Sequence, residues 1–145
     1  MKLEKNEIRR LIKDYLQNRK EIIFAYIFGS FVNADDFRDI DVAVYIDSPD
    51  LTKDFEKYPY GYESKILGEL AGILHSDKID LVLLNKSPLL ITHRIVNTGE
   101  LLFDKAKYRR INFENSVRKE FIDHEYFRKI RTYYLKKSIE ENARS

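Results

Sequence analysis

The sequence predicts an α/β (α+β) fold in which short strands are set among helices and a long helix follows at the C-terminus. Runs of β-branched and aromatic residues alternate along the chain with segments whose apolar residues recur at helical spacing. From residue 107 onward the chain contains neither Gly nor Pro, which favours one uninterrupted helix over about 107–140. The 145 residues suit a single domain, so we expect one domain over 1–145.

The composition indicates a folded, cytoplasmic protein. Apolar residues make up 43% of the chain and charged residues 34%, a balance that is too apolar for a disordered chain. No apolar run approaches the roughly 20 residues of a membrane-spanning helix, and the N-terminal segment lacks the apolar core of a signal peptide. Because Cys is absent, disulfides and thiolate metal ligands are excluded. We therefore expect no association with membranes.

A helix and a strand are predicted before residue 30. The helix covers about 4–18, where five apolar residues share one face: Ile8, Leu11, Ile12, Tyr15 and Leu16. The β-branched and aromatic run over 21–28 predicts a buried strand that ends at Gly29-Ser30. Polar and acidic residues then predict a turn over 31–38.

The strand predicted next, over 39–46, carries two acidic residues on one face. Side chains alternate between the two faces of a strand, so Asp39 and Asp41 point together and the apolar residues point the other way. Turn-forming residues over 47–61 predict a long loop. A helix over about 62–75 follows, with four apolar residues directed inward: Ile66, Leu70, Ile73 and Leu74.

Two more strands and two more helices complete the prediction. A largely buried strand covers 78–84, and Ser87-Pro88 caps and opens a helix that Gly99 closes. A short strand fits 101–103. In the C-terminal helix, six apolar residues are assigned to one face: Phe113, Val117, Phe121, Phe127, Ile130 and Tyr134.

The acidic pair and the Gly-Ser turn before it indicate a metal-assisted reaction of a nucleotide triphosphate. Two neighbouring carboxylates raise the pKa of at least one of them unless a cation lies between them. Oxygen ligands of this kind suit Mg²⁺. Gly29 permits close approach of the backbone, and Ser30 with nearby backbone N–H groups can bind a phosphate.

Asp80 is the third acidic residue of interest, because the strand around it is otherwise apolar. Its position along that strand allows its side chain to face Asp39 and Asp41. We expect Asp80 to be buried, where a carboxylate needs a metal ion or a hydrogen-bond partner.

Three separated motifs occur in order: Tyr26-Ile-Phe-Gly29-Ser30 with Asp39-Ile-Asp41, then Ile79-Asp80-Leu-Val-Leu-Leu, then Gly99-Glu-Leu-Leu-Phe-Asp104. Together they resemble the minimal nucleotidyltransferases of the DNA polymerase β superfamily, especially the MntA-type antitoxins that are paired with HEPN-domain toxins. The resemblance covers most of residues 20–104. It implies a nucleotidyltransferase fold, which is a small mixed β-sheet flanked by helices.

The resemblance also implies a Mg²⁺-dependent enzyme that transfers AMP from ATP and uses two Mg²⁺ ions. The resemblance implies that Asp80 completes one metal site and also helps to deprotonate the attacking hydroxyl. The implied catalytic and metal-binding residues are Asp39, Asp41 and Asp80, and the implied nucleotide-binding residues are Gly29 and Ser30. Compared with many members of the family, the interval of eight residues between Ser30 and Asp39 is short.

The implied acceptor is a protein hydroxyl, a tyrosine of a cognate HEPN ribonuclease toxin, so that the chain acts as an antitoxin. Two alternatives are open. One is transfer to a small molecule, as in aminoglycoside nucleotidyltransferases, and the other is a non-catalytic antitoxin that acts by binding. A chain of 145 residues has no room for a large separate substrate domain, so we expect the acceptor to dock against an open site.

Positive charge is concentrated in the C-terminal part of the chain. Residues 105–145 carry 12 basic and 6 acidic side chains, whereas residues 1–104 carry 14 basic and 18 acidic ones. Such a segment meets nucleic acid, phosphates or an acidic protein surface, or is a solvated helix face. We expect the toxin as its partner and no direct binding of nucleic acid. Arg38, directly before Asp39, either supplies positive charge to the site or is a solvated turn residue.

Overall fold

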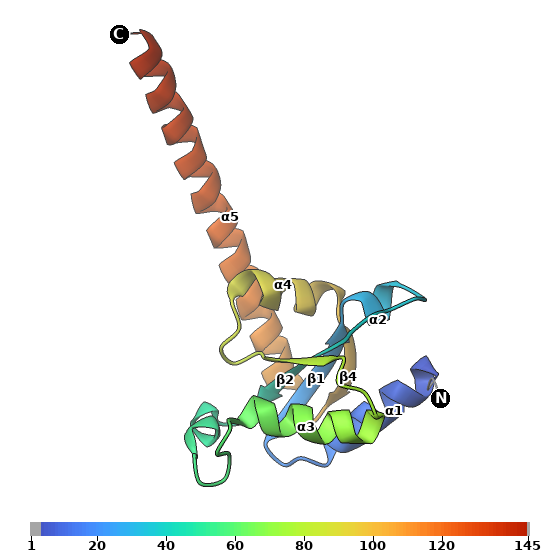
Figure 1. The fold of residues 1–145 in the computed structure, drawn as a ribbon. Coiled ribbons are helices and arrows are strands. Elements are labelled where there is room, and N and C mark those ends of the chain that lie inside the picture. The colour runs from blue at the N-terminus through green and yellow to red at the C-terminus, as the bar shows by residue number, and fades with distance from the viewer. Residues whose placement is uncertain (1–3, 145) are drawn as a thin grey trace.

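In the computed structural model, which describes residues 4–144, four strands form one mixed sheet in the order β3-β2-β1-β4 (Figure 1). β1 (Ile22–Phe28) pairs antiparallel with both β2 (Ile40–Ile46) and β4 (Glu100–Asp104). β2 pairs parallel with β3 (Ile79–Leu83). The predicted small mixed sheet is confirmed, and β2 lies inside it between β1 and β3.

Helices cover both faces of this sheet (Figure 1). α1 (Lys5–Gln17) and α3 (Tyr62–Leu74) pack on one face, where their buried apolar residues meet those of the strands. α4 (Leu89–Thr98) and the first part of α5 (Lys107–Arg144) pack on the other face through Ile95 and Phe113. The helices predicted from apolar periodicity are all present, with small shifts at their ends.

Side chains of β2 alternate between the two faces as predicted. Four of them enter the core beneath α1 and α3: Ile40, Val42, Val44 and Ile46. Ala43 and Tyr45 belong to the opposite face, and Asp41 lies on their side because the side-chain period of a strand is two. The acidic residue of β2 therefore lies on the face of the sheet that α4 and α5 cover.

The segment after β1 differs from the prediction. Instead of a polar turn over 31–38, a short helix, α2 (Ser30–Asn33), begins directly after Gly29. Phe31 is fully buried, and its ring packs edge-on against Phe37 with 4.8 Å between ring centroids. The sequence pattern did not reveal this anchor, because one buried aromatic residue produces no periodicity in so short a segment.

Smaller differences concern a loop, a cap and a strand length. The loop over 47–61 contains a 3₁₀ helix, η1 (Pro49–Lys53). Ser87 does not cap α4, because its hydroxyl donates to the carbonyl oxygen of Leu84 at 3.4 Å and contacts the Thr92 hydroxyl. Gly99 ends α4 as predicted, and β4 is longer than the predicted strand.

α5 begins against the sheet and then extends away from the rest of the protein (Figure 1). Phe113 packs on Tyr45 with 5.0 Å between ring centroids, and Val117 is buried, but Phe127 and Tyr134 are more than 60% exposed. Because successive residues turn by about 100°, the six apolar residues assigned to one face occupy two sides of α5, and that assignment is wrong. Within residues 4–144 no helix has the length and apolar character needed to cross a membrane.

Candidate active site

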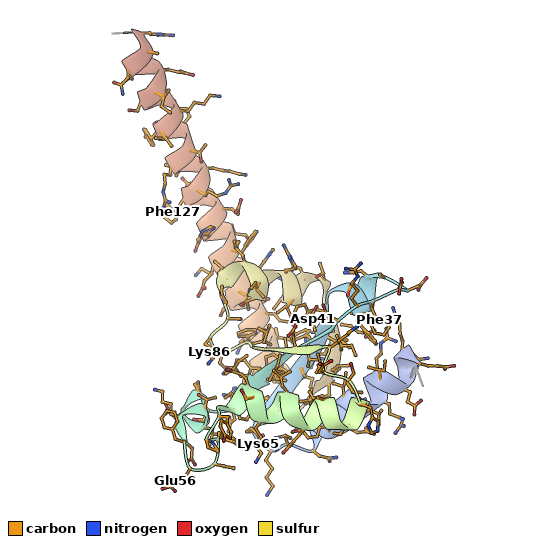
Figure 2. All side chains as sticks on the ribbon, viewed as in Figure 1. Phe37, Asp41, Glu56, Lys65, Lys86 and Phe127 are labelled. Atoms are coloured by element: carbon orange, nitrogen blue, oxygen red, sulfur yellow. The ribbon has the colours of Figure 1, made fainter. Side chains whose placement is uncertain are left out.

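Three acidic residues lie near one another at the start of two neighbouring parallel strands. Asp41 lies directly opposite Asp80 in the register of β2 and β3, and Asp39 precedes Asp41 by two residues. The main-chain N–H of Ile40 donates to the carbonyl oxygen of Lys78 at 3.0 Å, which fixes this register where the strands begin. Residues that face each other on adjacent strands point to the same side. Asp41 and Asp80 therefore share one face at the end of the sheet, where Asp41 lies (Figure 2), and Asp39, one residue before β2, is near enough for its charge to act on Asp41.

Gly29 lies against the carboxylate of Asp41. The register of β1 and β2 pairs Phe28 with Asp41, and Gly29 follows Phe28 directly. Gly29 has φ +78° and ψ −151°, a conformation that residues with side chains rarely adopt. A Cβ atom at this position would lie 3.3 Å from Asp41 Cγ and closer still to Oδ2. Both the backbone conformation and the space taken by the carboxylate therefore require glycine here.

Ser30 begins α2 with its hydroxyl near the acids, since Oγ donates to the carbonyl oxygen of Asp39 at 3.4 Å. Lys5 of α1 holds this turn in place. Its Nζ donates to the carbonyl oxygen of Phe31 at 2.7 Å and lies 5.2 Å from the centre of the Phe31 ring. No local sequence pattern points to Lys5, because the contact joins residues 26 positions apart.

The three carboxylates repel one another. Partial burial raises the pKa of the Asp41 carboxyl above its usual value, and the charges of Asp80 and Asp39 raise it further. Within residues 4–144 no three acidic or histidine side chains are already gathered around a point that could hold a metal ion. The donor set nevertheless fits Mg²⁺, because it consists of carboxylate oxygens whose repulsion a cation would relieve as it drew them together.

The expected burial of Asp80 is wrong. Its side chain is exposed, as is that of Asp39, whereas Asp41 is half-buried. The reason is that β3 lies at the edge of the sheet, so one flank of Asp80 is open. The register confirms that Asp80 lies beside Asp41, and the catalytic role of the three acids stays a prediction.

Arg38 lies away from the acidic face. It is exposed, and with Ile8, Leu74 and Lys78 it lines a cavity of about 420 Å³. Ile8 and Leu74 belong to the core beneath α1 and α3, so this cavity lies on the other side of β2 from the acids. The placement favours the interpretation of Arg38 as a turn residue.

A small mixed sheet that carries three acidic residues beside a Gly-Ser turn has the architecture of a nucleotidyltransferase. Residues 10–108 match the sequence model of the family described as "Polymerase beta, Nucleotidyltransferase". This match spans more than half of the chain, so the chain belongs to the polymerase β nucleotidyltransferase family. Its class of activity is therefore nucleotidyl transfer. No curated protein matches the sequence.

Several solved structures share the fold. A toxin–antitoxin structure with AMP-PNP is 24% identical with a TM-score of 0.64, and the alignment covers 88% of this chain and 94% of that chain. A complex of a tri-AMPylated Shewanella oneidensis HEPN toxin with its MNT antitoxin is 23% identical with a TM-score of 0.60, covering 86% and 89%. Another structure from Shewanella oneidensis is 21% identical with a TM-score of 0.63, covering 86% and 92%. These likenesses confirm the predicted nucleotidyltransferase fold, and α5 confirms the predicted long C-terminal helix.

Proposed function

We propose that this chain transfers AMP from ATP to a tyrosine hydroxyl of a cognate HEPN-domain toxin and so acts as an antitoxin. The observation that carries the proposal is the exposed face on which Asp39, Asp41 and Asp80 meet beside Gly29. Structural relatives support it, because one contains AMP-PNP and another contains an AMPylated HEPN toxin. The need for ATP agrees with the cytoplasmic location that the sequence predicts.

Each residue of the site has a separate role in this reaction. Asp39, Asp41 and Asp80 would hold Mg²⁺, which when bound neutralises phosphate charge and lowers the pKa of the attacking hydroxyl. The acceptor oxygen bonds to the α-phosphorus of ATP, the bond from that phosphorus to the bridging oxygen breaks, and pyrophosphate leaves. Asp80 accepts the hydroxyl proton. Gly29 permits close approach of its backbone to the phosphates, and the hydroxyl of Ser30 donates to a phosphate oxygen.

The openness of the site favours an acceptor on another macromolecule. Asp39 and Asp80 are both exposed, and Asp80 lies on an edge strand. A hydroxyl that projects from the surface of another protein can therefore reach the acids without an opening motion of this chain. A small acceptor would need a pocket that grips it on several sides.

The test is to incubate the purified chain with ATP, Mg²⁺ and the HEPN protein encoded beside it. Intact-mass spectrometry should show increments of AMP on a toxin tyrosine, together with loss of ribonuclease activity. Replacing both Asp39 and Asp41 by Asn should abolish the mass increments. A matched control replaces Asp35 and Asp36 by Asn, since these nearby exposed residues carry the same charge but lie outside the acidic face.

Two results would redirect the proposal. If the Asp39→Asn/Asp41→Asn protein still silences an unmodified toxin, the chain inhibits by binding and not by transfer. If the toxin is neither bound nor modified but an aminoglycoside accepts AMP, the acceptor is a small molecule.

A further inference from the structure

The distal part of α5, residues 122–144, carries apolar side chains that the rest of the protein does not cover. Six of them form what we call the distal stripe: Ile122, Tyr126, Phe127, Ile130, Tyr133 and Tyr134. Ile130 is half-buried, and the other five are 61–65% exposed. Phe127 lies on the extended part of α5, well away from the sheet (Figure 2).

The distal stripe occupies one side of the helix. At about 100° per residue, its six members fall within a sector of about 140°. Val117, which is buried, and Arg110, which pairs with Asp104, lie on the opposite side of α5. The stripe is therefore a second apolar surface and not a continuation of the face that packs on the sheet.

The size of the stripe suits a helix–helix interface. An aromatic side chain buries roughly 150–250 Å² when it is covered. With four aromatic residues at about 60% exposure, two copies together supply about 1,000 Å², the lower bound for a specific interface. On one copy the patch is about half of this, which is the size of the largest apolar patch of a typical monomer and is often functional.

The charges that flank the stripe indicate what covers it. Lys119 and Asp123 lie toward its N-terminal end, and Lys137 and Glu141 lie toward its C-terminal end. All four are exposed and fall on the same side of the helix as the stripe. Glu140 and Arg144 fall on this side as well, so the order of charge is positive, negative, apolar, positive, two negative and a final positive. A second copy that runs in the opposite direction places the positive residues of the first four against the negative ones, whereas a parallel copy places like charges together.

We propose that two copies of this chain pair through their distal stripes in antiparallel orientation, centred near Ile130. Asp123 of each copy then faces Lys137 of the other, and Lys119 faces Glu141. At a rise of 1.5 Å per residue, the two domains lie about 40 Å apart along the helix pair, at opposite ends. Both acidic faces stay free for an acceptor, so the pairing does not depend on the proposed function.

Cysteine cross-linking tests the pairing and its direction, since the natural chain has no Cys. Ile130→Cys should form a disulfide-linked dimer on mild oxidation. Asp123→Cys and Lys137→Cys should each stay monomeric on gels when oxidised alone, because identical positions lie about 20 Å apart in the antiparallel pair. A mixture of these two variants should form a cross-linked dimer. Arg128→Cys should not, because Arg128 lies on the side of α5 opposite the distal stripe.

Sedimentation of the unmodified chain provides a second measurement. The chain should be a dimer, and Tyr126→Glu/Tyr133→Glu should abolish the dimer while leaving the circular dichroism spectrum unchanged. Asp123→Lys alone should weaken the dimer, and Asp123→Lys/Lys137→Asp should restore it. Cross-linking of Asp123→Cys with itself would overturn the antiparallel orientation. A chain that stays monomeric at high concentration would overturn the pairing, even if the stripe then binds the toxin.

Discussion

The backbone of Gly29 lies directly against the carboxylate of Asp41, so a side chain at position 29 would displace that carboxylate. This contact connects the end of β1 to its neighbour β2 across their antiparallel pairing. The glycine of the Gly-Ser turn thus has a positioning role in addition to its proposed approach to the phosphates. It sets where the central acid of the three can lie.

Gly29→Ala should therefore lower both stability and transfer rate. We expect a loss of about 1–3 kcal/mol in the free energy of unfolding, because the backbone conformation is unfavourable for alanine. The rate should fall as well, because the new methyl group displaces the Asp41 carboxylate. Gly68→Ala is the matched control, since it lies in α3 with open space around it and should stabilise the protein by roughly 0.5–1 kcal/mol. A folded Gly29→Ala protein with full activity would contradict this role.

Asp41→Asn should stabilise the metal-free protein at neutral pH. Burial and the neighbouring acids raise the pKa of Asp41 in the folded state above its unfolded value. As pH rises through the interval between these two values, the folded state binds more protons than the unfolded one, so stability falls. The Asn side chain does not titrate, so the variant does not lose this stability. The difference in thermal stability between the variant and the natural protein should therefore grow from pH 3 to pH 7. Added Mg²⁺ should reduce the advantage by relieving repulsion in the natural protein, and an advantage that does not vary with pH would contradict the assignment.

Asp80→Asn should affect the rate far more than nucleotide binding. Because Asp80 is proposed to accept the hydroxyl proton, its loss should lower the transfer rate by roughly 10²–10⁴-fold. Titration calorimetry with ATP and Mg²⁺ should show a much smaller change in affinity, since Asp39 and Asp41 are retained. If affinity and rate fall in proportion, Asp80 serves nucleotide capture instead.

The local part of the site could be predicted from the sequence, and the long-range part could not. The face of β2 on which Asp41 lies follows from the two-residue period of a strand, which needs no tertiary information, whereas Asp39 lies one residue before β2. The exposure of Asp80 depends on the position of β3 at the edge of the sheet, and no local sequence pattern predicts the order of the strands. The contact between Lys5 and Phe31 also joins residues that are far apart in the sequence, so no local pattern predicts it.

α5 shows a different limit of sequence patterns. Apolar periodicity correctly predicts a long helix but cannot separate two apolar surfaces on the same helix. Val117 faces the domain, and Tyr134 belongs to the distal stripe on another side. The two surfaces can be distinguished only when the sheet and α4 show which part of the helix is already covered.

Arg110 should prove to be the main polar anchor of α5. Its Nε donates to Asp104 Oδ2 at 2.6 Å and its Nη1 donates to Glu114 Oε1 at 3.0 Å, where Glu114 also accepts from the Tyr26 hydroxyl. Arg110→Ala would remove the guanidinium that pairs with the largely buried carboxylate of Asp104, while Glu114 keeps its contacts with Tyr26 and Arg118. We expect a loss of about 3 kcal/mol in denaturant unfolding. Arg128→Ala, which removes a fully exposed pair with Glu125, should change stability far less, because solvent screens such pairs. Equal losses in the two variants would show that Arg110 is not a special anchor.

Charge reversal at Arg128 and Arg131 should slow AMP transfer to the toxin. Both residues are exposed on the side of α5 away from the distal stripe, and they contribute to the excess of positive charge over 105–145. If this charge guides the toxin toward the acidic face, Arg128→Glu/Arg131→Glu should lower the rate roughly tenfold at low salt, and the deficit should shrink as salt screens the interaction. The affinity for ATP should not change, because the acids lie on the sheet. Lys53→Glu/Lys57→Glu makes the same change in net charge on the loop around η1 and should have little effect. Equal slowing by both pairs would mean that net charge, and not the position of α5, controls the encounter.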